Sequence, residues 1–551
     1  MLLGIDVGGT HTDAVLIGEN GIESTFKAKT DTRNLLHTVT TALKEVTSGI
    51  DVKKIKNINL STTLSTNAII ENKLEKTALF ISSGPGIDPA NFRIGENTYI
   101  INGSINHRGS EVLKLDSPSI EKSMNACIKD NIKVFAAVTK FSTRNSIHES
   151  SIAASAEGQA DFITQGHTLS SQLSFPRRAA TAYYNSAVWR IYSNFLTAIM
   201  ESLKSMGIEA PVNILKADGG TMPAEVSKNL PVESILSGPA ASIMGIVALN
   251  KITEDAVILD IGGTTTDIAI FASGAPLMER EGISLEGIPT LVRSLQNRSI
   301  GIGGDSAITV VNGEVRTGPE RKGPCAAEGG EHPTLVDALN FKGITNHQNK
   351  EKSIEQIKLL AEKNKLKPEI LADKAIAFSV KKINDEIELL VSQINQKPVY
   401  TIHDMIQGKK IIPKKIYIIG GPAAALAVIM KDKIEIVVPE NYNVANAIGA
   451  ALARTTFETE LFSDTGKEKM VIPNLGIEEK VSRRYSLSEA ENDIIAHTRK
   501  YLEKSGYKDK DLKIDIVESS SFRMIDDYYA SGNDIRVKCQ IRPGVVMNLH
   551  K

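Results

Sequence analysis

One pattern of apolar and polar positions occurs twice along the chain. An apolar run, a pair of glycines with threonines and a second apolar run fill residues 2–17 and again residues 256–271. The polar centres are Asp6-Val-Gly-Gly-Thr-His-Thr-Asp13 and Asp260-Ile-Gly-Gly-Thr-Thr-Thr-Asp267, which are identical at six of eight positions. Apolar runs on both sides of a tight glycine turn predict a β-hairpin. The sequence therefore predicts the same hairpin at two places.

Each predicted hairpin has the composition of a phosphate-binding turn. Glycines lack a β-carbon, so an anion can approach the backbone closely and meet its N–H groups. The glycines concerned are Gly8, Gly9, Gly262 and Gly263. Threonines add hydroxyl donors, namely Thr10, Thr12, Thr264, Thr265 and Thr266. Asp6 and Asp260 could hold Mg²⁺ or orient a water molecule beside a polyphosphate. A single such stretch could be an ordinary turn, but its repetition favours a shared function.

Strands and helices alternate through the rest of the chain. Helical spacing predicts a helix over residues 33–48 and a long helix that begins at Pro176 and buries Ile191 among other apolar residues. Strands are predicted at residues 78–82, 134–138, 213–217 and 434–438, two helices at 353–396 and another helix at 443–452. This alternation is typical of an α/β protein.

Further loops offer candidate ligand contacts. Residues 298–308 contain Gly303 and Gly304, and residues 416–426 contain Gly420 and Gly421 after a buried strand. The second loop would let a flat base lie against the backbone. The Ser/Thr-rich stretch 61–67 has two interpretations, either the cap of a short helix or the lining of a cleft. Residues 317–333 form an irregular segment rich in glycine and proline, of the kind that is often functional or mobile.

The composition excludes some classes of function. The formal charge is -1, from 64 Lys and Arg against 65 Asp and Glu, so nothing indicates binding to nucleic acid or to an anionic membrane. Three cysteines lie far apart and show no metal-binding spacing. No signal peptide or apolar run of membrane-spanning length is recognisable. We expect a cytoplasmic protein.

The C-terminal part, from about residue 457, is predicted to be a small α/β module behind a linker. Residues 458–469 are polar and linker-like, residues 487–505 have the spacing of an amphipathic helix, and residues 513–518 and 534–542 are predicted to pair as strands. The module would pack on the core or contact a partner.

The order of these motifs resembles that of the actin, sugar kinase and Hsp70 superfamily, and within it the hydantoinase A and 5-oxoprolinase family. The matching segments lie between residue 2 and about residue 455. The resemblance implies two ribonuclease-H-like lobes around an ATP cleft. We expect the first lobe at 1–175, the second at 176–456 with a Gly/Pro-rich insertion at 273–345, and the linker and C-terminal module at 457–551.

The resemblance also implies an activity. ATP and Mg²⁺ would bind between the hairpins, Gly420 and Gly421 would border the adenosine, and a cyclic amide such as a hydantoin, 5-oxoproline or a lactam would be phosphorylated on its carbonyl oxygen and hydrolysed. Asp6 and Asp260 would coordinate the metal or act as the general base, whereas Asp13 and Asp267 would brace the hairpins. A second, B-type subunit is expected as a partner, and self-association is left open.

Some residues depart from the family pattern. Arg298 and Ser299 replace a His-Thr pair, Asp305 stands where glycine is common, and His11 replaces an aromatic residue, where it could pack or bind a ligand. Two other functions therefore stay open. One is an ATP-dependent carboxylase or kinase-like subunit of the acetone carboxylase type. The other is a non-catalytic nucleotide-dependent switch.

Overall fold

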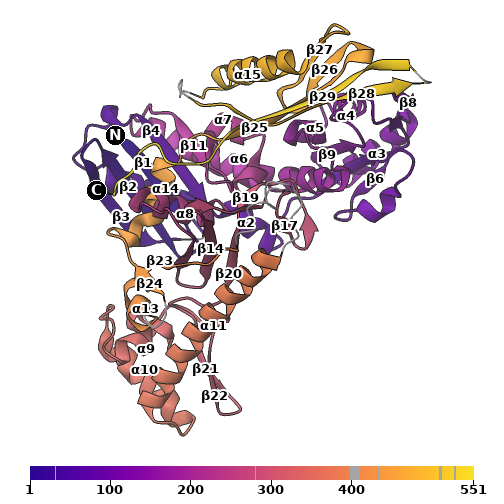
Figure 1. The fold of residues 1–551 in the computed structure, drawn as a ribbon. Helices are drawn as coiled ribbons and strands as arrows, with labels where there is room; N and C mark the ends of the chain where they lie inside the picture. Colours follow the sequence, from indigo (N-terminus) through magenta and orange to yellow (C-terminus); the bar gives the residue numbers. More distant parts are fainter. Residues whose placement is uncertain are drawn as a thin grey trace.

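The computed structural model describes residues 1–31, 33–279, 281–396, 410–430, 434–507, 512–526 and 529–550 (Figure 1). It is a mixed α/β structure, as the sequence predicts. Its first sheet has the strand order β12-β11-β4-β1-β2-β3. These strands are β1 (Leu2–Val7), β2 (His11–Gly18), β3 (Gly21–Lys29), β4 (Asn57–Thr62), β11 (Val212–Leu215) and β12 (Thr221–Pro223). Since β11 and β12 come after residue 175, the expected lobe division does not coincide with the edge of this sheet.

A second sheet repeats this arrangement. Its order is β15-β14-β13-β23-β24, and the short strand β20 also pairs with β14. In each sheet an antiparallel hairpin, β1–β2 or β13–β14, is followed on the other side by a parallel strand, β4 or β23. The strands of the second sheet are β13 (Ala256–Ile261), β14 (Thr266–Ala272), β15 (Ala275–Pro276), β20 (Asn297–Ile300), β23 (Lys415–Ile419) and β24 (Glu435–Val437). The repeated sequence therefore corresponds to a repeated topology, and the two-lobe expectation is confirmed.

Two helices cross between the sheets. Helix α8 (Ser237–Leu249) packs on the second sheet, and helix α14 (Ala445–Leu452) packs on the first. Their backbones touch because glycines stand at the crossing. A β-carbon on Gly449 would lie 1.9 Å from the carbonyl oxygen of Ala241, and one on Gly245 would lie 2.1 Å from that of Ala445. The small-residue faces of both helices thus set how closely the two halves approach.

A third sheet, entirely parallel, extends the first half of the chain. Its order is β10-β9-β5-β6, and helix α6 packs mainly against the inner strand β9. Its strands are β5 (Thr77–Ser82), β6 (Thr98–Ile100), β9 (Val134–Thr139) and β10 (Phe162–Gln165), and the helices of this half are α1 (Leu35–Val46), α2 (Leu64–Ile70), α3 (Ser117–Lys129), α4 (Ile147–Ser155), α5 (Gly166–Leu169), α6 (Phe175–Ser205) and α7 (Ala224–Ser227). The prediction that Ile191 is buried was wrong, because this residue of α6 is 37% exposed.

Residues 275–396 add small hairpins and three helices to the second half. Helices α9 (Leu335–Phe341), α10 (Lys350–Lys363) and α11 (Pro368–Gln396) share one apolar core with strands β13 and β14, and they project from the body in Figure 1. The predicted pair of helices broken near Pro368 is confirmed. The short strands here are β16 (Met278–Glu279), β17 (Ser284–Leu285), β18 (Ile288–Pro289), β19 (Ser294–Leu295), β21 (Ile308–Val311) and β22 (Glu314–Thr317). Helix α13 (Ala423–Ile429) follows β23.

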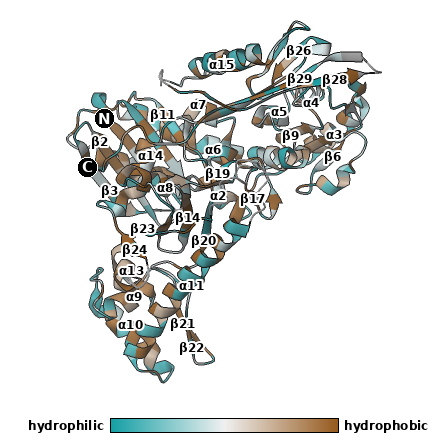
Figure 2. Cartoon of the chain, viewed as in Figure 1, coloured by the Kyte–Doolittle hydropathy of each residue, from teal (hydrophilic) through white to brown (hydrophobic). Residues whose placement is uncertain are grey.

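The C-terminal module is a five-stranded sheet, β27-β26-β25-β29-β28, covered by helix α15 (Leu487–Lys504). Its strands are β25 (Phe457–Asp464), β26 (Lys469–Ile472), β27 (Ile477–Lys480), β28 (Asp515–Asp526) and β29 (Tyr529–Ile541). The prediction of a linker at 458–469 was wrong, because β25 is the central strand of this sheet. Two of its polar residues form ion pairs with the rest of the protein, Glu458 with Arg293 and Asp464 with Arg108. In Figure 2 helix α15 is mostly hydrophilic, whereas the strands beneath it mix hydrophilic and hydrophobic residues. Across the described ranges, no helix combines the length and the apolar character that crossing a membrane requires.

The crossing of α8 and α14 leads to a prediction on stability. Gly449→Ala should lower the free energy of unfolding by about 3 kcal/mol, because the new methyl group meets backbone atoms that cannot move aside. The control is Gly207→Ala, whose β-carbon meets nothing within 4 Å and whose φ of +69° costs only about 1 kcal/mol. Denaturant unfolding of both variants would measure the difference, and equal losses would contradict the close crossing.

Candidate functional site

The two hairpins close their turns in the same way. The N–H of Gly8 donates to the carbonyl oxygen of His11 at 3.0 Å, and the N–H of Gly262 donates to that of Thr265 at 2.9 Å. The next two amides of each turn, those of Gly9 and Thr10 and those of Gly263 and Thr264, have no hydrogen-bond acceptor among the described residues. Each turn therefore uses its first glycine N–H for itself and leaves two amides for an anion.

The tips of the hairpins face each other. A β-carbon on Gly263 would lie 3.4 to 3.5 Å from side-chain atoms of Thr10. The third glycine loop lies against the second tip, since the N–H of Gly304 donates to the carbonyl oxygen of Gly262 at 2.9 Å and that of Asp305 to Gly263 at 2.6 Å. Segments that are far apart in the sequence thus form one wall.

A cavity of about 290 Å³ lies between the hairpins. Most of the predicted site residues line it, namely Asp6, Gly8, Thr10, Asp260, Gly262, Gly263, Gly304, Gly420 and Gly421. The others are not among its lining residues, namely Gly9, Thr12, Thr264, Thr265 and Gly303. The hydroxyl of Thr12 pairs with that of Thr30 at 2.9 Å, and Gly303 is packed behind Gly263.

Asp6 and Asp260 lie at the base of the cavity. Asp260 accepts hydrogen bonds from the Ser242 hydroxyl at 2.5 Å and the Asn446 amide at 3.2 Å. Asp6 is only 4% exposed, and its Oδ1 has no hydrogen-bond partner among the described residues. Burial raises the pKa of Asp6 to about 7, although hydrogen bonds with Ser61 and Asn446 oppose this shift. An acceptor that is buried and unsatisfied needs a cation or a donor, and no described residue supplies one here.

The second aspartate of each hairpin lies directly across the ladder from the first, Asp13 opposite Asp6 and Asp267 opposite Asp260. Burial raises the pKa of Asp13, but Lys27 opposes this shift with an ion pair of 2.7 Å. Lys27 also donates to the carbonyl oxygen of Asn443 at 3.0 Å. Burial, with the charge of Asp260, raises the pKa of Asp267 to about 7. Asp13 therefore joins β2 to β3, in line with the bracing role expected for it.

Gly420 and Gly421 form the opposite rim. Gly420 has a φ of +95°, and a β-carbon there would lie 2.3 Å from the carbonyl oxygen of Ile261. A β-carbon on Gly421 would meet nothing within 4 Å. The first glycine therefore allows the chain to pass close to β13, and the second leaves open space toward the cavity.

Three residues of the site were missed from the sequence. Asn446 and Ser242 come from the two crossing helices, and Lys27 comes from β3. The sequence predicts a helix at 443–452 around Asn446, but nothing in it indicates that Asn446 or Ser242 contacts Asp260. Nothing in the sequence around Lys27 indicates that it contacts the site, because its partner Asp13 lies on the neighbouring strand β2.

The remaining candidate residues lie partly inside and partly outside the cavity. The Ser/Thr stretch 61–67 does not line the cavity, and its side chains bond to neighbouring elements, for example Ser65 to Ser234 at 3.0 Å. The stretch therefore connects neighbouring elements, but it does not cap α2 as one interpretation expected, because Thr63 at the start of α2 makes no side-chain capping hydrogen bond. His11 and Asp305 do line the cavity. Arg298 turns away from it and pairs with Glu386 at 2.7 Å.

Cys325, Glu328 and His347 also meet at the cavity wall. Glu328 is held by Lys29 at 2.5 Å and by His347 at 2.8 Å. Burial, with the nearby charges of Asp337, Glu328 and Asp305, raises the pKa of Cys325 to about 12. We interpret this cluster as a polar wall of the cavity.

Comparisons with known proteins agree with this geometry. Caprolactamase subunit alpha of Pseudomonas jessenii is 27% identical over 377 residues, which are 61% of this chain and 53% of that subunit, so the match spans about half of its length. The solved structure of the ATP-dependent caprolactamase from the same organism has a TM-score of 0.67 at 20% identity and covers 98% of this chain and 87% of that chain. Nucleotide-free acetone carboxylase has a TM-score of 0.70 at 17% identity, covering 99% and 88%. These two likenesses establish a shared fold.

Two family models match the chain. The model of the hydantoinase/oxoprolinase N-terminal region matches residues 2–159, where the first hairpin lies. The hydantoinase/oxoprolinase model matches residues 178–459, which contain the second hairpin and the loop of Gly420 and Gly421. With both hairpins inside the matched ranges and the two models spanning most of its length, the chain belongs to the hydantoinase/oxoprolinase family.

Proposed function

We propose that this protein is an ATP-dependent hydrolase that opens a cyclic amide by phosphorylating the carbonyl oxygen of the amide. The observation that supports this most is the pair of facing hairpins, each with two amides that lack an acceptor, above the carboxylates of Asp6 and Asp260. Family membership and the similarity to a caprolactamase subunit point to the same substrate class.

The phosphates of ATP would lie between the hairpin tips. Free amides at Gly9, Thr10, Gly263 and Thr264 would donate to phosphate oxygens. Gly420 and Gly421, in the loop between β23 and α13, would border the adenosine. A cavity of about 290 Å³ is of the size that small ligands and cofactors occupy.

The residues present also fit Mg²⁺. Asp6 Oδ1 is buried without a partner, Asp260 lies beside it, and the oxygen ligands of carboxylates are those that Mg²⁺ takes. Mg²⁺ would neutralise charge on the transferred phosphoryl group. Asn446 and Ser242 would orient Asp260, and Lys27 would hold Asp13 in place.

Phosphorylation overcomes the stability of the amide. The amide bond is stabilised by resonance, and its oxygen is a poor leaving group. Attack of that oxygen on the terminal phosphorus of ATP breaks the bond to ADP. Water then adds to the activated carbon, and the ring nitrogen leaves with a proton, which gives an acyl phosphate. A second water molecule hydrolyses this acyl phosphate to the carboxylate and free phosphate. Within this chain, catalysis would rest on positioning and charge neutralisation, with Asp6 as the candidate general base.

We further propose that a second, B-type subunit completes the enzyme. The name of the caprolactamase relative designates one subunit of an assembly, and the present chain matches about half of that subunit. ATP is plentiful in the cytoplasm, which is where we expect the enzyme to act. The lobe boundaries at residues 175/176 and 456/457 stay a proposal, although the first sheet continues beyond residue 175 to β12.

The deciding experiment is phosphate release from Mg-ATP in the presence of hydantoins, 5-oxoproline, lactams, ketones with bicarbonate, or carboxylates. Each compound is assayed with and without the protein encoded beside this one. Stimulation by a ring compound, with the opened product detected by mass spectrometry, is the expected result. Stimulation only by a ketone with bicarbonate would instead favour an activity of the acetone carboxylase type, and tight ATP binding with no stimulated turnover would favour a switch.

Asp6→Asn tests the role of the unpartnered carboxyl group. We expect the rate of ATP turnover to fall at least about 100-fold while the fold is kept, because a neutral amide cannot hold the cation or accept a proton. Asp13→Asn is the matched control. Its carboxylate is already paired with Lys27, so its loss of turnover should be about tenfold or less. Equal losses in both variants would contradict the separate roles.

The raised pKa values of Asp6 and Asp267 predict how stability depends on pH in the absence of Mg²⁺ and nucleotide. Their pKa values are about 7 in the folded protein against 3.8 for an aspartate exposed to water in the unfolded chain, so the folded state binds more protons between these values. The free energy of unfolding should therefore fall as the pH rises from about 4 to about 7, and then level off. Asp6→Asn should flatten this fall, which denaturant unfolding at several pH values would measure. If Asp6→Asn leaves the dependence of the free energy of unfolding on pH unchanged, the raised pKa of Asp6 is contradicted.

A further inference from the structure

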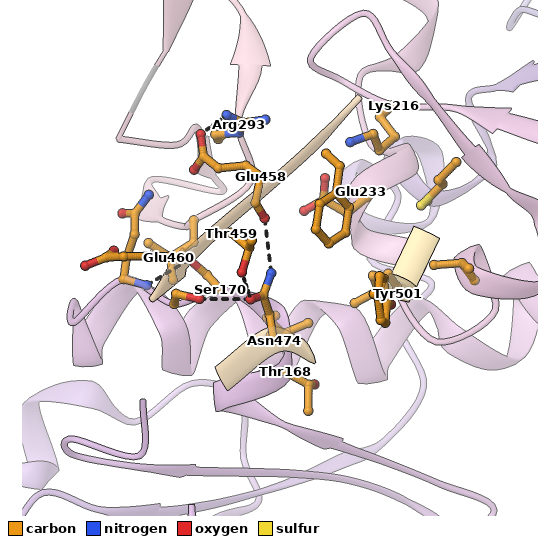
Figure 3. A pocket seen from close by; sticks show the side chains of 18 of the residues that line it. Thr168, Ser170, Lys216, Glu233, Arg293, Glu458, Thr459, Glu460, Asn474 and Tyr501 are labelled. Atoms are coloured by element: carbon orange, nitrogen blue, oxygen red, sulfur yellow. Dashed lines mark hydrogen bonds and ion pairs between the residues drawn. The ribbon is translucent and has the colours of Figure 1, made fainter. Parts of the chain in front are cut away.

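A second cavity lies where the C-terminal module meets the first half of the chain. It has a volume of about 100 Å³, and it shares no lining residue with the nucleotide cleft among the described residues. Figure 3 shows Lys216 and Glu233 on one side and Glu458, Thr459 and Asn474 on the other. The cavity is therefore built from both parts of the protein. It is too small for a nucleotide but has room for a small molecule.

Charged groups are concentrated around this cavity. Asp218 is buried and pairs with Lys216 at 3.2 Å and with Arg293 at 3.1 Å. Glu458 pairs with Arg293 and, at 3.0 Å, with Lys538. Glu233 and Glu460 add two further carboxyl groups to the lining of the cavity, and Arg144 and Lys538 are the cations that act most strongly on Glu460.

Two of these carboxyl groups lack partners. Neither Glu233 nor Glu460 forms a side-chain hydrogen bond or ion pair with any described residue, although both line the cavity. Burial raises the pKa of each, and the nearby charge of Lys216 opposes this for Glu233. The ammonium of Lys216 has three donors and uses one, toward Asp218. The cavity therefore offers unused acceptors at Glu233 and unused donors at Lys216.

An aromatic wall lies beside Glu233. The ring of Phe457 is 5.4 Å from that of Tyr501 and 6.4 Å from that of Tyr507. Met222 and Leu230 extend the apolar surface. Aromatic faces attract organic cations and pack against alkyl chains, so this wall suits an aliphatic ligand with an ammonium group.

We propose that this cavity is a second ligand site that binds a small amino acid, with the ammonium group of the ligand at Glu233 and its carboxylate at Lys216. The site goes beyond the proposed function, because its ligand is defined by the charges of this cavity and not by the chemistry of the ATP cleft. Two sources share the required chemistry. One is the linear amino acid that opening a lactam would release, and the other is a free α-amino acid.

The test is calorimetric titration of the full chain, without nucleotide, with ω-amino acids of four to six carbons and with α-amino acids. Alkylamines, carboxylic acids and lactams of equal length serve as ligand controls. We expect an amino acid to bind at least about tenfold more tightly than ligands that lack either charge. Binding of ω-amino acids alone would identify the ring-opened product, and binding of α-amino acids would identify a separate metabolite.

Variants locate the binding. Glu233→Gln should weaken amino-acid binding by about tenfold or more, because a charge-assisted hydrogen bond is lost. The matched control is Glu225→Gln, whose exposed carboxylate pairs with Lys228 and does not line the cavity, and it should bind normally. Asp6→Asn in the nucleotide cleft should also bind normally. The proposal is overturned if no amino acid binds below about 10 mM, if the singly charged ligands bind as tightly, or if Glu233→Gln binds unchanged.

Discussion

The contact of α8 with α14 is the constraint on which the rest of the structure depends. At Gly245 and Gly449 the two helix backbones come so close that no room is left between them for even a single methyl group. This contact fixes the distance between the sheets and so the distance between the two hairpin tips. The same helices deliver Ser242 and Asn446 to Asp260. A packing requirement and a catalytic requirement are therefore met by one pair of helices.

The charges at the base of the cleft destabilise the folded protein when no cation is bound there. Four aspartates stand in two cross-strand pairs, and like charges placed directly opposite each other are unfavourable. Lys27 compensates only Asp13. Desolvation and the remaining repulsion raise the pKa values of Asp6 and Asp267. A bound divalent cation would relieve both, so affinity for the metal and strain in its absence have the same origin.

Local patterns predicted the parts of this protein better than their assembly. The hairpins, the break between α10 and α11 and the amphipathic α15 follow from periodicity, glycine and proline. The facing of the hairpins could be expected only from their repetition and a family resemblance. Strand β25 was missed because its polar residues point at the charged interface with the core, which the pattern alone cannot distinguish from solvent. Lys27, Asn446 and Glu233 were missed because their importance comes from neighbours distant in the sequence.

The position of α14 has a consequence for how the chain is made. Residues 447–452 cover Val15 and Ile17 in the first sheet, and Asn59 caps the carbonyl oxygens of Ala450 and Ala451. During synthesis from the N-terminus, these early strands therefore wait for more than four hundred residues before their permanent cover emerges from the ribosome. Throughout that interval one apolar face of the nascent protein lacks its native partner, and it would be the natural surface for a chaperone to shield.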